Sequence, residues 1–476
     1  TAVTQTRSAQ GRPNIILILA DDLGYGDLAC YGNDVLRTPH IDRLASEGVR
    51  CSQHYTSSPL CAPARGALLT GRYNHRVGAL SVESNRGLDR IALREQTLGD
   101  VFSAAGYATG YVGKWHSGLF DLRHHPNRRG FAEFAGFLNG IMDYWDWIFD
   151  YNGQTRFSDG RYQTDVLTQE AVDFIDRHAS EPFFLHLAYH APHTPLQAPE
   201  EDIARYQGTP GICDAVARLY AMIDRMDQGI GQVLAKLDSE CLTENTLVLF
   251  TSDNGPWLGG HNHDGKRVEL ARYNGPFRGM KQDVLEGGIR VPAIVRWPAG
   301  LPAGTECHDM IHFCDWLPTL SAAAGATPNG RPLDGVDAIK ALSGGGSLSH
   351  VKRFWQHNRY DPVLHCNMAM RDGNWKLYWP RIPEAMVKLR EDNDWAYRLV
   401  REPHRLMPVS NPPVERELSL APTPQLYDLS DDPLESTDLA VREPERVLRM
   451  SREADAWFES VERDRVDAFR TLGINT

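Results

Sequence analysis

The sequence predicts an α/β fold in which a large, mostly parallel sheet is flanked by helices. Short apolar runs, such as residues 13–20 and 246–251, have the length of buried strands, and the segments between the runs have helical spacing. Strands that alternate with helices at these intervals suit β-α-β crossovers, which make parallel sheets. Four of the predicted strands end in polar clusters. Because ligand sites collect beyond the carboxyl ends of parallel strands, we expect one shared site at that edge.

Helix boundaries support this alternation. Thr38 and Pro39 provide an N-cap and a first helical residue, and Gly106 can end a helix that begins at Thr97. The predicted strands cover residues 13–20, 107–112, 182–188, 246–251 and 291–295. The predicted helices cover residues 38–45, 64–69, 97–105, 162–178 and 215–237.

The last third of the chain has a different character. Residues 344–347, Gly-Gly-Gly-Ser, are typical of a linker. Short alternating runs predict a small antiparallel sheet from residues 353–356, 369–372, 375–378 and 425–429. Residues 380–424 are rich in proline and are expected to be irregular. Residues 444–469 predict an amphipathic helix that turns Val447, Leu448, Trp457 and Val461 toward the core. We therefore expect a large domain of residues 1–345 and a smaller C-terminal domain of residues 346–476.

Composition argues against several classes of function. The chain has 476 residues, with 50 Lys and Arg against 62 Asp and Glu, and its net charge of −12 argues against non-specific binding of nucleic acid. No apolar run reaches the roughly 18 residues of a membrane span, so we expect no transmembrane segment. The eight cysteines show no CxxC or zinc-type spacing. We expect free thiols, with Cys307 and Cys314 as the pair that could form a bridge.

Residues 59–72 carry the central chemistry. Pro63 suits the first turn of a helix and Gly71 suits its end, which puts Cys61 at the helix start. Free N–H groups and the positive end of the helix dipole favour anions there. Arg65 lies one turn further on and returns to the same face. Taken alone, this arrangement indicates a thiolate nucleophile, and the alternative is a buried structural cysteine.

Two pairs of oxygen-bearing side chains follow predicted strands. Asp21 and Asp22 come after the first strand, and Asp253 and Asn254 come after the strand of residues 246–251. Each pair alone is more often a turn. Brought together on parallel strands, three carboxylates and an amide suit Ca²⁺ or Mg²⁺ better than zinc, which prefers cysteine and histidine.

Lysines and histidines form the remaining candidates. Lys114 and His116 stand two residues apart at a strand end, where extended chain would turn both to one side. His193 lies between two prolines and could give a proton near neutral pH, with His190 as a nearby competitor. Lys281 precedes a glycine-rich segment. The alternative for each is an exposed lysine or a loop histidine with a backbone partner.

In combination, these motifs resemble the type I sulfatases. Cys-x-Pro-x-Arg at residues 61–65, followed by Leu-Thr-Gly-Arg, resembles the family signature, although Ala64 stands where Ser is commoner. Three further segments resemble family motifs and follow in the same order. They are Gly-Lys-Trp-His at residues 113–116, Pro-His-x-Pro at 192–195, and Gly-x-Lys with Glu-Gly-Gly-x-Arg-x-Pro at 279–292. The similarity runs from about residue 14 to residue 439 and looks closest to arylsulfatase A and the N-acetylgalactosamine-6-sulfatases.

The resemblance implies an alkaline-phosphatase-like fold and a particular maturation. In that family, a formylglycine-generating enzyme oxidises the signature cysteine to formylglycine (3-oxoalanine), an aldehyde that is hydrated in the resting enzyme. Cys61 would be that residue here. The implied metal ligands are Asp21, Asp22, Asp253, Asn254 and the matured residue 61, with Ca²⁺ as the ion and Mg²⁺ as the alternative.

The resemblance also implies how a sulfate ester would be hydrolysed. The implied catalytic residues are Cys61, Arg65, Lys114, His116, His193 and Lys281. One hydroxyl of the hydrated residue 61 would attack sulfur, while Lys114, His193 and Lys281 bind the sulfate. His193 would give a proton to the leaving oxygen, and His116 would act as the base that restores the aldehyde.

The implied substrate is a sulfated carbohydrate or an aryl sulfate. Loop residues near the strand ends could stack on or grip a sugar, although packing in the core or at the rim is the alternative for them. These candidates are Asn139, Asp143, Trp145, Asp146, Trp147, Trp257, His261, Asn262, His263, Asp264, His357, Asn358 and Arg359. His263 is the one that we add to the substrate-binding set.

Two other interpretations stay open. One is a phosphoester or phosphonate monoester hydrolase on the same fold, because sulfate and phosphate are similar tetrahedral anions. The other is an unmatured protein that binds sulfated glycans without turnover. We expect a periplasmic or secreted location, with a cytoplasmic one as the alternative, although residues 1–10 show no apolar signal core.

Overall fold

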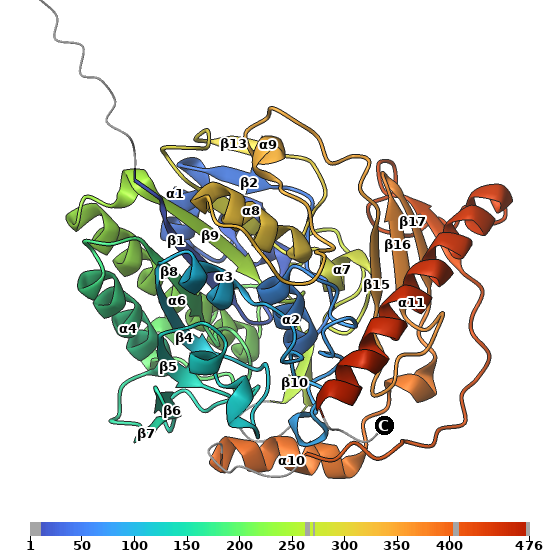
Figure 1. Ribbon diagram of the computed structural model, residues 1–476, viewed down its shortest axis with the longest axis horizontal. Coiled ribbons are helices and arrows are strands. Elements are labelled where there is room, and N and C mark those ends of the chain that lie inside the picture. Colours follow the sequence, from blue (N-terminus) through green and yellow to red (C-terminus); the bar gives the residue numbers. More distant parts are fainter. Residues whose placement is uncertain (1–10, 262–266, 270–271, 403–408, 473–476) are drawn as a thin grey trace, which may run out of the picture.

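The computed structural model describes residues 11–261, 267–269, 272–402 and 409–472 (Figure 1). Within these residues, the main feature is a mixed sheet of ten strands. The strands are, in spatial order, β13 (Thr305–Cys307), β2 (Val49–Cys51), β12 (Ala293–Arg296), β9 (Thr246–Ser252), β1 (Asn14–Ala20), β8 (Phe183–Ala188), β4 (Ala108–Lys114), β5 (Glu133–Phe137), β6 (Ile148–Tyr151) and β7 (Gln154–Phe157).

The centre of this sheet is parallel. β1 pairs in parallel with β8 on one side and with β9 on the other, and β4 joins β8 to β5 in the same direction. β12 and β6 pair antiparallel with the outer strands of this block. The predicted α/β fold with a mostly parallel central sheet is confirmed, and the carboxyl ends of the five central strands lie along one edge.

Helices cover both faces of the sheet, so β1 is buried along its whole length. Alternate side chains of a strand point to opposite faces. Ile16 packs in the core beneath α1, α4 and α6, whereas Leu17 packs in the core beneath α2, α3 and α8. Each such buried side chain contributes roughly 1.5–3 kcal/mol. These helices are α1 (Pro39–Ser46), α2 (Cys61–Thr70), α3 (Leu98–Ala104), α4 (Gln163–Arg177), α6 (Asp214–Ser239) and α8 (Trp316–Ala324).

Shorter elements join these layers. The short helices are α5 (Glu200–Ile203), α7 (Glu286–Ile289) and α9 (Ile339–Leu342). Two further strand pairs are β3 (His54–Tyr55) with β14 (Ile311–His312), and β10 (Gly259–His261) with β11 (Arg267–Glu269). No helix of the described residues is long and apolar enough to cross a membrane.

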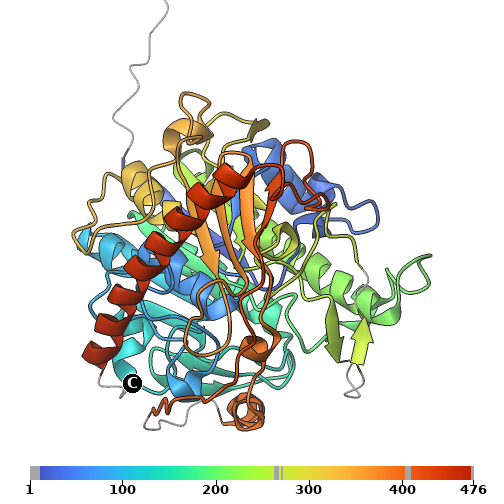
Figure 2. The ribbon, with the colours of Figure 1, turned by 90° about the vertical axis from the view of Figure 1, so that its right-hand side faces the viewer.

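The predicted small antiparallel sheet is confirmed. Its strands are, in spatial order, β15 (Arg353–Gln356), β16 (Met368–Asp372), β17 (Trp375–Trp379) and β18 (Gln425–Asp428). The long helix α11 (Pro444–Leu472) lies across this sheet (Figure 2). We propose that residues 346–476, which contain this sheet and helix, form the smaller domain.

The structure places one predicted core residue of α11, Leu448, on the outer face of the helix. Met450, Ala454, Trp457 and Val461 are buried against the small sheet, at intervals of three and four residues. That spacing is the one that keeps side chains on one face of a helix. The prediction that Leu448 faces the core is wrong, because it falls outside this series and is 53% exposed.

The segment expected to be irregular contains a helix. Residues 390–401 form α10 (Arg390–Arg401), although residues 409–424 have no regular structure. The prolines that dominate the composition of residues 380–424 all lie outside α10. The proline content of the whole segment therefore does not reveal that twelve of its residues can form a helix.

Cys307 and Cys314 are both free thiols, so the suggested bridge between them is wrong. Cys307 lies at the end of β13, where it pairs in register with Cys51 of β2. Cys314 instead packs in the core between α2 and the small sheet. The two thiols therefore belong to different packing clusters.

A buried lysine links α7 to the small sheet. Lys376 on β17 lies 3.0 Å from Glu286 and 2.8 Å from Glu435, and none of these three side chains is exposed. Burial on its own raises the pKa of Glu286, but Lys376 and two nearby arginines outweigh it and hold the pKa at about 2. The two carboxylates therefore depend on a shared ammonium group.

We expect Lys376→Met to lower the free energy of unfolding by about 3–5 kcal/mol, because it leaves two buried carboxylates without this cation. Chemical denaturation followed by circular dichroism measures the change. Lys352→Met is the control, because Lys352 pairs with Glu453 at a site where the two side chains are 37% and 30% exposed. The control should lose less than about 1 kcal/mol. Equal losses in the two variants would contradict this account of the Lys376 network.

Candidate active site

Polar side chains from four neighbouring strands meet at the carboxyl edge of the parallel block. The strands lie in the order β9-β1-β8-β4. They lead, in that order, to Asp253 and Asn254, to Asp21 and Asp22, to His190 and His193, and to Lys114 and His116. The structure therefore brings together residues that are more than 230 positions apart, as in the hydrogen bond of 3.2 Å that the Asp22 backbone N–H donates to the Asp253 carboxylate.

Cys61 is the first residue of α2 and lies at the same edge. Leu60 before it has the extended backbone of an N-cap. Gly71 ends the helix with φ of 68°, a left-handed conformation that suits glycine. The side chain of Cys61 is almost fully buried, and its sulfur lies within 4.8 Å of carboxylate oxygens of Asp21 and Asp253.

The Cys61 thiol is held in its neutral form. Burial raises the pKa of the thiol, against the opposing effect of Lys114 and Lys281. A resting thiolate, which is the first interpretation of this helix start, is therefore disfavoured.

Arg65 is fixed one turn along α2. Its Nε and Nη2 donate hydrogen bonds of 3.0 and 2.8 Å to one oxygen of Asp253, and Nη1 donates a bond of 2.8 Å to the Lys114 carbonyl. The guanidinium also lies 3.6 Å from Asp21. Burial and the neighbouring Asp21 raise the pKa of Asp253 to about 6, with Arg65 acting in the opposite direction. Arg65 is thus a fixed cation rather than a mobile one.

Each of the two lysines has an aspartate of its own. Lys114 Nζ donates to Asp21, and Lys281 Nζ donates a hydrogen bond of 2.6 Å to Asp22. Asp22 also accepts a bond of 2.7 Å from the Asn254 amide. Burial on its own would raise the pKa of Asp22, but Lys281 and His193 outweigh it and lower the pKa. The lysines therefore reach the site from two sides, on β4 and on the loop before α7.

His116 lies beyond the end of β4 with a left-handed backbone, φ 49°. A Cβ atom on Gly140 would stand 2.5 Å from the His116 ring, so this ring position requires glycine there. Burial, with Lys114 and Arg65, lowers the pKa of His116 well below its usual value. Its Nδ1 has no hydrogen-bond partner among the described residues. His116 is therefore a neutral, buried imidazole that can accept a proton.

His193 reaches the cavity, whereas His190 does not. His193 Nδ1 lies 2.7 Å from the Thr194 carbonyl, which leaves Nε2 directed toward Asp22 at 3.7 Å. Burial lowers the pKa of His193 to about 3. His190 is fully buried and stacks between His193 and Tyr144, with ring centroids 5.1 and 4.8 Å away. Of the two histidines, His193 is the one that lines the cavity.

The cluster has the donors of a cation site. Two buried oxygens, Oδ1 of Asp21 and Oδ1 of Asn254, have no hydrogen-bond partner among the described residues. Together with Asp22 and Asp253 they form an oxygen-rich set, which suits hard cations such as Ca²⁺ and Mg²⁺. A divalent cation would satisfy both oxygens and reduce the repulsion between the carboxylates.

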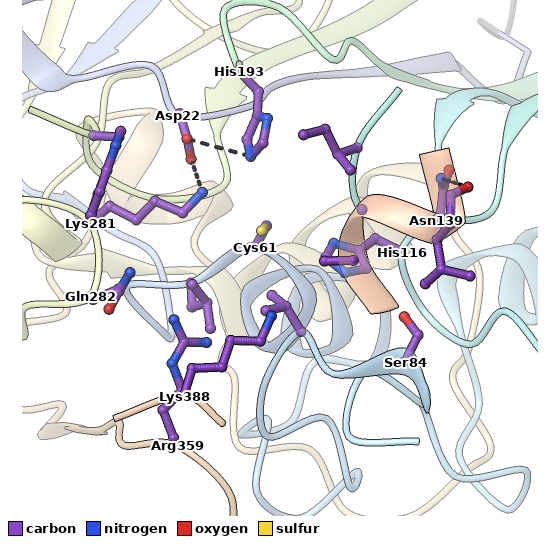
Figure 3. A pocket seen from close by; sticks show the side chains of 17 residues that line it. Asp22, Cys61, Ser84, His116, Asn139, His193, Lys281, Gln282, Arg359 and Lys388 are labelled. Atoms are coloured by element: carbon purple, nitrogen blue, oxygen red, sulfur yellow. Dashed lines mark hydrogen bonds and ion pairs between the residues drawn. The ribbon is translucent and has the colours of Figure 1, made fainter. Parts of the chain in front are cut away.

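A cavity of about 260 Å³ opens over Cys61 (Figure 3). Small-molecule sites have roughly 300–1,000 Å³, so this one suits a small ligand or one end of a larger ligand. Asp22, Cys61, His116, His193 and Lys281 all line it. Lys114 and Arg65 lie beneath it, fully buried.

Three of the predicted sugar contacts also line the cavity, namely Asn139, Trp257 and Arg359. The remaining described candidates, Asp143, Trp145, Asp146, Trp147, His357 and Asn358, are not among its lining residues. Trp147, for example, is buried and donates to the Arg161 carbonyl at 2.9 Å. His263 lies outside the described residues, as do Asn262, Asp264 and the side chain of His261.

Nine lining residues were not found from the sequence. They are Leu60, Val82, Ser84, Gly140, Ile141, Gln282, Lys388, Ala396 and Leu399. The last three come from α10 and the turn before it, in the segment expected to be irregular. The absence of proline from residues 390–401 was the signal that could have revealed the helix.

The chain is similar in sequence to known sulfatases. Residues 13–326 match the sequence model of the family described as Sulfatase. A steryl-sulfatase of Rattus norvegicus is 34% identical over 452 residues, which cover 76% of this chain and 74% of that protein. An N-acetylgalactosamine-6-sulfatase of Canis lupus familiaris is 37% identical over 365 residues, which cover 70% of this chain and 66% of that protein.

A solved structure shares both fold and sequence. The crystal structure of Ps i-CgsB in complex with k-i-k-neocarrahexaose matches with a TM-score of 0.77 and 30% identity, over 94% of this chain and 92% of that one. The fold is thus that of the alkaline-phosphatase-like hydrolases. The chain belongs to the sulfatase family, and it is a sulfuric ester hydrolase.

We expect Ca²⁺ to bind the oxygen cluster and to raise the midpoint of thermal unfolding. A ligand that binds only the folded state adds about 2.7 kcal/mol at 100 times its Kd. Asp253→Asn should remove the shift, and equilibrium dialysis with elemental analysis counts the bound ions. Asp159→Asn is the control, because that side chain is 48% exposed and distant in the fold. Equal midpoints in Ca²⁺ and in chelator, with no ion bound, would refute the cation site.

Proposed function

We propose that this chain hydrolyses sulfate monoesters of a sulfated carbohydrate or an aryl sulfate at the cavity over residue 61. The observation that carries the proposal is the placement of Cys61 at a helix start beside Asp21 and Asp253, with Lys114 and Lys281 on either side. This arrangement offers an anion both a helix end and two ammonium groups. The similar protein Ps i-CgsB was crystallised in complex with an oligosaccharide, k-i-k-neocarrahexaose, which supports a glycan as the substrate class.

We propose that a formylglycine-generating enzyme converts Cys61 to formylglycine. The neutral, buried thiol is poorly suited to attack, because a thiolate is the nucleophilic form. When formed, the hydrated aldehyde would supply an oxygen nucleophile in place of sulfur. Arg65 would stabilise negative charge on that side of the site, since its guanidinium is held in place by Asp253.

We propose Ca²⁺ as the resident ion, with Mg²⁺ as the alternative. Asp21, Asp22, Asp253, Asn254 and the matured residue 61 would hold it. The ion would supply positive charge beside the nucleophile and the sulfate oxygens. The two unpartnered oxygens of Asp21 and Asn254 support this assignment.

Lys114, Lys281 and His193 are proposed to bind the sulfate group. In the structure, the lysines donate hydrogen bonds to Asp21 and Asp22. Each ammonium group has further N–H donors for an incoming oxyanion. Donors fixed before the reaction stabilise charge as it develops, without reorganisation.

The two histidines are proposed to divide the proton transfers. An anionic sulfate beside the His193 ring would raise the pKa of that ring, because a nearby negative charge favours the imidazolium. His193 would then give its proton from Nε2 to the leaving oxygen. His116, which is neutral in the structure, would take the proton from the second hydroxyl of residue 61.

We expect Cys61→Ala to abolish turnover of 4-nitrophenyl sulfate and to preserve the fold, because it removes the precursor of the nucleophile. The wild-type peptide that holds residue 61 should show a mass lower by about 18 Da, the change from cysteine to formylglycine. Peptide mass spectrometry and circular dichroism check both points. Turnover by the alanine variant at the wild-type rate would contradict the proposed role of residue 61.

We expect His193→Ala to lose about 10²–10⁴-fold in kcat on an alkyl or sugar sulfate, because a poor leaving group needs a proton donor. The loss should be much smaller on 4-nitrophenyl sulfate, whose phenolate leaves without a proton. His308→Ala, at a side chain that is 70% exposed, is the control and should match the wild type on both substrates. Equal losses on good and poor leaving groups would show that His193 is not the proton donor.

Paired substrates separate the open alternatives. Matched aryl sulfate, phosphate and phosphonate monoesters, assayed with converted protein, test the phosphoester alternative. We expect the sulfate to have the highest kcat/KM. Tight glycan binding without turnover by fully converted protein would favour the binding-only alternative.

A further inference from the structure

We propose that Arg359 and Lys388 form a second anion-binding subsite, so that the preferred substrates carry another negative group besides the sulfate that is removed. This inference rests on the proposed function. It names a narrower substrate class, namely sulfate esters with a second oxyanion, which is either a carboxylate or a second sulfate.

The two cations stand on the cavity wall opposite the catalytic groups. Arg359 follows β15 of the small sheet, and Lys388 precedes α10. Both line the same cavity as Cys61. In Figure 3 they lie across the cavity from Asp22 and His193, with Cys61 between the two groups. A ligand with a sulfate at residue 61 would therefore present its other end to them.

The charges on this wall do not balance. Arg359 Nη1 lies 3.3 Å from Oε1 of Glu83, and Lys388 Nζ lies 3.7 Å from the same oxygen. The Glu83 side chain is fully buried, and no other carboxylate is paired with either cation among the described residues. Two cations thus share one carboxylate, at distances longer than those of the pairs that Arg65 forms with Asp253, and Lys281 with Asp22.

The catalytic half of the cavity differs in this respect. Arg65, Lys114 and Lys281 each have an aspartate of their own. Among the described residues that surround the cavity, the excess positive charge therefore lies at Arg359 and Lys388. A buried cation without a full counter-charge is costly, and a ligand oxyanion would supply that charge.

Arg359 has unused donor capacity. The residue is 7% exposed, and its Nε has no hydrogen-bond partner among the described residues. Its Nη1 has only contacts of 3.3 Å, to Ser81 and to Glu83. Burial lowers the pKa of Lys388, with Arg359 acting in the same direction and with Glu83 and Asp392 acting against it. A guanidinium next to an ammonium suits a carboxylate or a sulfate, which can accept from both.

The same cavity also has apolar lining. Leu60, Val82, Ile141 and Leu399 are among the residues that line it. The amide of Asn139 donates a bond of 3.0 Å to the Leu399 carbonyl, which holds α10 against the cavity. These apolar side chains can contact the ring of a sugar or an aryl group whose two ends are anionic.

The test uses phenyl sulfates and biphenyl-4-yl sulfates with one distal substituent, which is hydrogen, carboxamide, carboxylate or sulfonate. The carboxamide matches the carboxylate in shape without its charge, and the two scaffolds vary the distance. For converted wild-type protein, we expect kcat/KM for an anionic probe to exceed that for the carboxamide by about tenfold or more at low salt. The preference should fall as ionic strength rises, because salt screens charge.

Variants show which residues cause the preference. Lys388→Gln and Arg359→Gln should each reduce the ratio of anionic to carboxamide kcat/KM by about tenfold, and Lys388→Glu should reverse it. Lys388 is the safer of the two sites for substitution, because its side chain is 15% exposed. Lys352→Gln, on the surface beside Glu453, is the matched control and should keep the wild-type ratio.

The outcomes separate this inference from the proposed function. A higher rate with carboxylate supports a uronate-like group, and a higher rate with sulfonate supports a second sulfate. Turnover of all probes with equal kcat/KM, or an unchanged ratio in both Lys388 variants, would overturn the second subsite and leave the sulfatase activity standing. Failure of converted wild-type protein to hydrolyse any of the probes, charged or uncharged, would overturn the proposed function itself.

Discussion

The pairing of each buried cation with its own aspartate is the interaction on which the site depends. The pairs are Arg65 with Asp253, Lys114 with Asp21 and Lys281 with Asp22. Removing one partner of a buried pair costs about 3–5 kcal/mol, so the elements that carry these residues must meet in one arrangement. The parallel register of β1 and β9, which sets Ala20 beside Ser252, fixes the distance between the two acidic loops.

This pairing also explains why the cluster can serve catalysis. The aspartates hold the ammonium groups in place, and one oxygen of Asp21 still has no partner among the described residues. The cluster can therefore take up a hard cation on its carboxylate side and an oxyanion on its lysine side. The wall at Arg359 and Lys388 differs, because Glu83 is shared between two cations. In our proposal, the paired cations near Cys61 act on any sulfate ester, whereas the incompletely paired Arg359 and Lys388 select among substrates.

The sequence predicted the features that depend on local pattern. The strands before Asp21, Lys114 and Asp253 are short apolar runs, and their polar ends had to meet once the sheet was parallel. It could not predict features set by tertiary packing. The position of Lys388 depends on α10, a helix hidden among prolines, and the outward position of Leu448 depends on which face of α11 meets the small sheet. The separation of Cys307 from Cys314 likewise follows from the pairing of β13 with β2.

In the proposed mechanism, the nucleophile derived from residue 61 attacks the sulfur atom of the ester. Hydrolysis of a sugar sulfate by converted protein in water enriched in oxygen-18 tests this step most directly, with mass spectrometry of both products. We expect the heavy oxygen to enter the released sulfate and the alcohol to keep its own oxygen. Heavy oxygen in the alcohol would show cleavage of the carbon–oxygen bond and would contradict attack at sulfur.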